Sequence, residues 1–113
     1  MKEKFDNDTL VLLLKAAMAA PTTANNQPWE FVVVNEKSAM NALRKEIFFG
    51  QYNAPAAIVV CGNMKWAFSS PSTEYWVQDC SAAIQNILLA AAGMGLGSVW
   101  IGLYPLPSKI KPI

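Results

Sequence analysis

Apolar and polar stretches alternate along the chain in a pattern that predicts helices and strands in turn. Residues 9–20, TLVLLLKAAMAA, are rich in helix-forming residues and stop at Pro21. Just before them, Asp6, Asn7 and Asp8 offer side chains that can cap the first turn. We therefore predict a helix over residues 9–20. Because this helix is apolar almost all round, we expect it to be buried.

Two short runs of β-branched residues predict the first two strands. Residues 30–34 contain three consecutive valines, and residues 56–61, AAIVVC, follow Pro55, which suits the start of a strand. Between the two runs, residues 36–49 mix charged residues with apolar residues at roughly helical spacing. This part of the chain is therefore expected to form a strand, a helix and a second strand.

The second half of the chain predicts a long helix, a stop and a third strand. Residues 77–92 are rich in alanine and leucine, and Gly93 or Gly95 is expected to end the helix. Residues 98–101, SVWI, are then predicted to form a strand. Helices that alternate with apolar strands indicate a mixed α/β sheet that is buried on both faces.

Length and composition indicate a single domain and narrow the classes of partner that it could bind. The chain has 113 residues, which suits one domain over residues 1–113. Its net charge is +1 and its only arginine is Arg44, so neither nucleic acid nor an acidic membrane surface is expected as a partner. Only 15% of the residues are charged, against about 25% in a typical domain, and none from Cys80 to Ser108. This apolar character indicates either a membrane segment or a surface that is buried in a partner.

Three glycines at alternate positions argue against a membrane-spanning helix and against a dinucleotide-binding site. The uncharged residues 87–103 approach the length of about 20 that spans a membrane, but Gly93, Gly95 and Gly97 interrupt any helix there. A buried helix, a turn and a buried strand explain the segment better. The same glycines do not predict a dinucleotide site, because they follow a helix and precede a strand, whereas that site needs the opposite order.

Side chains with their own reactivity are scarce. The sequence has no histidine, which excludes Ser-His-Asp and Cys-His catalysis and histidine-ligated metal sites. Cys61 and Cys80 lack metal-site spacing and are expected to be buried free thiols in a reducing cytoplasm. Glu74 and Asp79 flank the start of the long helix, where capping explains them. We predict no catalytic side chain and no metal, so an enzyme of this composition would need a cofactor.

One loop gathers uncharged hydrogen-bonding groups, in the segment APTTANNQPW over residues 20–29. Its threonine, asparagine and glutamine side chains suit the edge of a planar heterocycle, which presents N–H and C=O groups. Such side chains also cap their own backbone in ordinary turns, and the residues by themselves favour that explanation.

Two longer stretches change this balance. Residues 20–34, APTTANNQPWEFVVV, resemble the Ala-Pro-Ser/Thr, Asn-x-Gln-Pro-Trp and apolar-strand pattern of the FMN-dependent nitroreductase family. Residues 79–105 resemble the second half of that family, where an alanine-rich helix leads through Gly-Leu-Gly to a strand, and residues 54–63 fit its middle strand. The resemblance covers roughly residues 10–110. It implies an α+β fold with a sheet flanked by helices.

The resemblance also implies a cofactor, a reaction and a partner. Members form homodimers with FMN between the subunits, and pass hydride from NAD(P)H through flavin N5 to a nitroaromatic, a quinone or a related small-molecule acceptor. Two segments would contact the cofactor: Pro21, Thr22, Thr23, Asn25 and Gln27 in the first, and Ile101, Gly102 and Leu103 in the second. Gln27 would brace its loop, and a glycine at position 102 suits close approach of backbone to the ring.

The chain departs from the family pattern at its two ends. No arginine-rich segment that would bind the FMN phosphate precedes Phe5, and the further strand that follows in the family is missing after residues 104–113. We therefore expect a partial nitroreductase-like domain, truncated at both ends. Arg44 is the sole arginine available to the phosphate, and the possible substitutes are Lys2, Lys4, Lys109 and Lys111. The alternatives are a non-catalytic module of the same fold that acts through an apolar dimer surface, and an unrelated small α/β protein.

Overall fold

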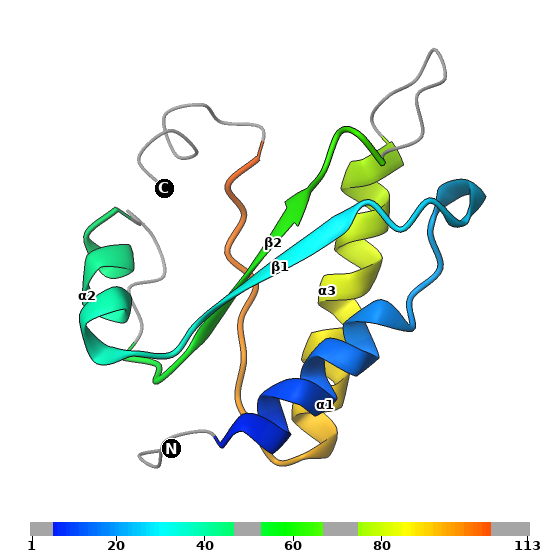
Figure 1. Ribbon diagram of the computed structural model, residues 1–113. Helices are drawn as coiled ribbons and strands as arrows, with labels where there is room; N and C mark the ends of the chain where they lie inside the picture. Colours follow the sequence, from blue (N-terminus) through cyan, green and yellow to red (C-terminus); the bar gives the residue numbers. More distant parts are fainter. Residues whose placement is uncertain (1–5, 47–52, 67–74, 105–113) are drawn as a thin grey trace.

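Three helices and a two-stranded sheet form the computed structural model, which describes residues 6–46, 53–66 and 75–104 (Figure 1). The elements in chain order are α1 (Asn7–Met18), the 3-10 turn η1 (Thr23–Asn25), β1 (Trp29–Val34), α2 (Lys37–Glu46), β2 (Ala57–Gly62) and α3 (Tyr75–Gly93). The expected α+β class is confirmed. Helices α1 and α3 and both strands lie close to their predicted bounds, and the predicted end of the second helix lies outside the described residues.

The strands pair in the antiparallel direction, with Trp29 opposite Gly62 and Val34 opposite Ala57. Helix α3 packs against both strands and α1 packs against α3, while α2 lies at the far end of the sheet (Figure 1). Val32 on β1 remains 51% exposed, so the expectation of a sheet buried on both faces is wrong for the described chain. An antiparallel sheet needs helices on only one face, because its connections do not have to cross over the other.

The core between α1 and α3 is built from small residues. Ala17 and Ala83 are completely buried, and they form one cluster with Ala20. Alanines let the two helix backbones approach closely, and the Asn86 side-chain amide donates a hydrogen bond of 2.9 Å to the carbonyl of Ala16 on α1. This bond links the two helices beside the alanine cluster, against which Trp29, Phe31 and Ile87 also pack.

Helix α1 begins as predicted but is less buried than predicted. The Thr9 N–H donates to the Asp6 carboxylate at 2.9 Å, which confirms an N-cap and lowers the pKa of Asp6. The expectation of burial all round is wrong, because Leu12 is 52% exposed and Met18 is 49% exposed. In the single chain, α3 covers one face of α1 and leaves the other apolar face open.

The end of α3 confirms the predicted stop at glycine. Gly95 adopts a left-handed backbone with φ of 78°, the Leu96 N–H donates to the Ala91 carbonyl (2.9 Å), and the Gly95 N–H donates to the Ala92 carbonyl (3.1 Å). This pair of hydrogen bonds is the Schellman motif, which satisfies the last carbonyls of a helix. Among the described helices, none is both long enough and apolar enough to cross a membrane.

The third strand predicted over residues 98–101 is wrong. After α3 the chain continues through residues 96–103 without regular structure, and Val99 and Trp100 are 54% and 44% exposed. β-branched and aromatic residues favour a strand only where a neighbouring edge can complete the hydrogen-bond ladder. In the described part of the chain the sheet order is β1-β2, so this segment is not part of the ladder.

Candidate functional site

The loop between α1 and β1 has an unusual backbone. Ala24, Asn25 and Gln27 adopt left-handed conformations, with φ of 53°, 57° and 53°. For a residue with a Cβ this conformation costs about 1–2 kcal/mol, because the Cβ crowds the following carbonyl oxygen. Strain of this kind persists only where the surroundings hold it, and it is concentrated at functional sites.

Some polar groups of the loop form hydrogen bonds within the loop itself. The Asn25 N–H donates to the Thr22 carbonyl (3.0 Å), and the Gln27 N–H donates to the Thr22 hydroxyl oxygen (3.1 Å). The Gln27 side-chain amide donates to Asn25 Oδ1 at 3.3 Å. Thr22 therefore acts as a turn cap, as the simpler explanation expects. The side chains of Asn25 and Gln27 are exposed, so their remaining amide groups face solvent.

A buried carboxylate on α3 fixes the loop from outside. The Thr23 N–H and hydroxyl both donate to Asp79 Oδ1, at 2.9 and 3.1 Å, and Asp79 is only 4% exposed. The other oxygen, Oδ2, is buried and has no hydrogen-bond partner among the described residues. The prediction that Asp79 caps a helix is wrong, because α3 starts at Tyr75 and places Asp79 inside the helix. Glu74 lies outside the described residues.

The structure brings the second predicted segment toward the same end of α3. The ring of Tyr104 meets the ring of Trp76 edge to face, with centroids 4.7 Å apart. Trp76 lies one turn before Asp79, so Tyr104 and Thr23 each contact a residue in the first turns of α3. Gly102 is exposed, and a Cβ added there would meet no atom of the described chain within 4 Å. Gly102 therefore has open space beside it in the described chain.

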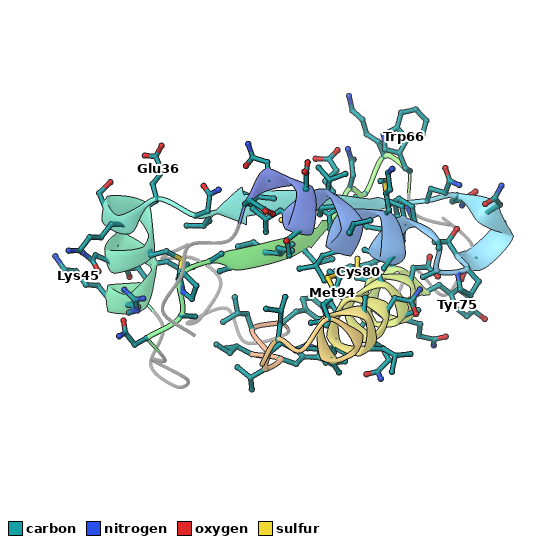
Figure 2. The ribbon with its side chains drawn as sticks, turned by 90° about the horizontal axis from the view of Figure 1, so that it is seen from below. Glu36, Lys45, Trp66, Tyr75, Cys80 and Met94 are labelled. Carbon is teal, nitrogen blue, oxygen red and sulfur yellow. The ribbon has the colours of Figure 1, made fainter. Side chains whose placement is uncertain are left out.

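The single arginine does not join this site. Arg44 lies in α2, where its guanidinium donates to the carbonyl of Ala54 at 2.7 Å and to Asn41 Oδ1 at 2.9 Å. Figure 2 shows Glu36, which precedes α2, and Lys45 of α2 at one end of the sheet, and Tyr75 of α3 toward the other. Within one chain, Arg44 thus anchors α2 beside the start of β2. The other candidates for the phosphate are Lys2, Lys4, Lys109 and Lys111, which lie outside the described residues.

The cysteines are poor nucleophiles. The Cys80 thiol donates to the Cys61 carbonyl at 3.8 Å; burial, with Asp79 and Cys61 nearby, raises the pKa of Cys80 to about 11. Partial desolvation of its sulfur and the neighbouring Glu30 also raise the pKa of Cys61. Both are free thiols; the predicted burial is confirmed for Cys80 and wrong for Cys61, which is exposed on β2. Over the described ranges, no three potential metal ligands come together.

The raised pKa of Cys80 predicts a loss of stability in alkali. The thiol ionises near its ordinary pKa of 9.0 in the unfolded chain and near 11 in the folded chain. The unfolded state therefore gives up this proton first, and the free energy of unfolding falls as pH rises from about 9 to 11. Urea unfolding across this range should show a shallower loss in Cys80→Ala. Equal slopes in the two proteins would contradict the assignment.

Comparison with known proteins identifies the family. Residues 1–51 and 45–111 match the sequence model of the Nitroreductase family. The chain belongs to the nitroreductase family. It is 45% identical over 112 residues to an Archaeoglobus fulgidus protein provisionally named NADH dehydrogenase/NAD(P)H nitroreductase, and the match covers 97% of this chain and 63% of that relative. The chain thus spans less than two thirds of the length of this relative.

Solved structures show the same nitroreductase fold. A Parabacteroides distasonis protein of the same provisional name is 37% identical, with a TM-score of 0.87 over 99% of this chain and 65% of its own. A provisionally named nitroreductase from Desulfovibrio desulfuricans, solved in complex with FMN, is 30% identical, with a TM-score of 0.81 over 90% of this chain and 59% of its own. These matches agree with the described helices and strands.

Proposed function

We propose that the chain is the flavin-binding part of an FMN-dependent oxidoreductase, which passes hydride from NADH or NADPH to a nitroaromatic, quinone or related small-molecule acceptor. The observation that carries the proposal is the loop of residues 22–27, whose strained backbone presents uncharged polar side chains and is fixed to α3 by Asp79. The names of the relatives and the FMN-bound neighbour support the same activity. When bound, FMN would supply the atom that accepts and returns hydride.

The residues of the loop fit the edge of a flavin ring. That edge alternates carbonyl oxygens and an N–H group, and the exposed amides of Asn25 and Gln27 offer both donors and acceptors. Thr22 and Thr23 hold the backbone beneath them, and Pro21 leads into the turn. Across the site, the backbone of Ile101, Gly102 and Leu103 would lie against the ring, where the absence of a side chain at 102 leaves room. Within one chain Arg44 does not reach this site, so another group would hold the FMN phosphate.

We propose further that two copies of the chain associate. Apolar side chains remain exposed on α1, on α3 and in the segment after α3: Val11, Leu12, Met18, Leu89, Val99 and Trp100. Such residues are uncommon on a lone soluble domain in this number and are typical of contact surfaces. Sedimentation equilibrium at micromolar concentration is expected to give a dimer. A monomer at these concentrations would contradict this part of the proposal.

Removal of the Asn25 side chain tests the role of the loop. Asn25→Gly deletes the amide and adds no strain, because glycine adopts left-handed backbone freely. We expect FMN to bind about tenfold more weakly, a loss of about 1.4 kcal/mol, with little change in the melting temperature of the flavin-free protein. Fluorescence titration with FMN and thermal unfolding measure the two effects.

The matched control is Ala24→Gly in the same turn. It relieves left-handed strain and removes no polar group, so FMN affinity should be unchanged and stability unchanged or higher. If Asn25→Gly lowers the melting temperature and leaves FMN affinity intact, the loop is only a turn. A dimer that takes up FMN and oxidises NADH or NADPH in the presence of benzoquinone or p-nitrobenzoate would support the enzyme. A dimer that does neither would support the non-catalytic module.

A further inference from the structure

Asp79 differs from the other residues that α3 buries. The buried residues of this helix are Asp79, Cys80, Ala83 and Ala91, and Asp79 is the acid among them. A carboxylate that is 96% removed from solvent is costly unless donors compensate it. Both donors that it receives come from Thr23, which is 56 residues away in sequence. The cost of burying this acid is therefore coupled to the position of the loop.

We propose that Asp79 is a positioning residue for the flavin loop, a role that rests on the proposed function. Its Oδ1 accepts from the N–H and the hydroxyl of Thr23, at the first residue of η1. The next two residues, Ala24 and Asn25, are both left-handed. By holding Thr23, Asp79 keeps the strained turn in the conformation that presents the amide of Asn25.

The energetics favour this role over general stabilisation. Left-handed backbone at three non-glycine residues favours relaxation of the loop, and the internal bonds that Thr22 accepts move with the loop when it relaxes. The bonds to Asp79 are different because α3 is packed against α1 and the sheet and stays in place. Both bonds from Thr23 also converge on the same carboxylate oxygen, so they fix the position of the backbone and of the side chain together. Without Asp79 the helix can remain folded while the loop loses its fixed point.

Asn86 supplies the matched comparison. It also lies on α3, two turns after Asp79, and its side chain also bonds to the backbone of the N-terminal region, at the Ala16 carbonyl. Its contact joins two helices and not the loop. Asn86→Ala should therefore lower the melting temperature without changing FMN affinity or the motion of residues 22–27.

The first experiment requires no flavin. Amide hydrogen exchange of the flavin-free protein should be at least about tenfold faster over residues 22–28 in Asp79→Ala than in the wild type, with the amides of α1 and β1 unchanged. Asp79→Asn, whose Oδ1 can still accept from Thr23, should restore most of the protection. If loop exchange in a folded Asp79→Ala variant equals that of the wild type, the proposal is overturned.

The second experiment measures FMN affinity in a double-mutant cycle. Thr23→Val removes the hydroxyl at constant shape and keeps the N–H, so it is expected to fold even if Asp79→Ala does not. We expect affinity to fall about 10-fold in Thr23→Val and about 10- to 100-fold in Asp79→Ala, with the double variant no weaker than Asp79→Ala. Additive losses, or unchanged affinity in Thr23→Val, would overturn the proposal. If the wild type itself takes up no FMN, the proposed function fails, and the exchange experiment still decides whether Asp79 holds the loop.

Discussion

The Gly62→Ala variant is expected to lose about 1–3 kcal/mol of the free energy of unfolding. A Cβ at position 62 would lie 2.4 Å from Cε3 and 3.0 Å from Cδ2 of the Trp76 ring, and 3.1 Å from Cε of Met64. Methionine can move aside, but the indole is rigid and its ring also packs on Tyr104. Alanine therefore forces β2 and α3 apart. Thermal unfolding of the flavin-free protein, followed by circular dichroism, measures the loss.

Gly93→Ala is the control for this prediction. Gly93 ends α3, and a Cβ there would meet nothing within 4 Å, so alanine should be neutral or stabilise the helix by up to about 1 kcal/mol. If Gly62→Ala has the same melting temperature as the wild type, β2 does not pack closely on Trp76 as described. Because Tyr104 packs on the Trp76 ring, that result would also weaken the placement of Tyr104 beside α3.

The Gly102→Val variant is expected to bind FMN at least about a hundredfold more weakly, a loss of about 2.7 kcal/mol. The proposed site needs the ring to approach the backbone at 102, and a branched side chain would occupy that space. Within the described chain, nothing lies within 4 Å of the added Cβ, so the melting temperature of the flavin-free protein should not change. Titration with FMN and thermal unfolding separate the two effects.

Gly97→Val provides the matched control, because position 97 is equally open and lies outside the two segments assigned to the flavin. It should leave both FMN affinity and melting temperature close to those of the wild type. Unchanged FMN affinity in Gly102→Val would remove residues 101–103 from the site. It would leave the case for residues 22–27 intact, because that case depends on Asn25.

Local pattern was sufficient for most of the elements. Helix propensity and an acidic cap predicted α1, valine runs predicted β1 and β2, and glycine after an alanine-rich run predicted that α3 ends at Gly93 or Gly95. Each of these features depends on residues that are close in sequence. The failed strand at residues 98–101 and the exposed face of α1 depend on what packs against them, which composition does not reveal.

In the candidate site, too, features that depend on nearby residues were predicted, and features that depend on distant contacts were not. The chemistry of the loop was visible in its composition, but its left-handed backbone was not, because Ala24 and Gln27 have no intrinsic preference for it. The role of Asp79 was missed because its partner is 56 residues away. A single acid inside an otherwise uncharged helix was the available signal. Arg44 was considered for the phosphate because it is the only arginine, yet the fold places it in α2, against Ala54.

The most direct test of the account is the visible absorption spectrum of the protein purified without added flavin, with any released chromophore identified by mass. We predict a flavin spectrum, release of FMN on denaturation, and loss of the bound flavin in Gly102→Val. A colourless protein that also fails to take up added FMN would contradict the central claim. The loop of residues 22–27 would then be a turn held by Asp79, in a member of the nitroreductase family that binds no flavin as this chain.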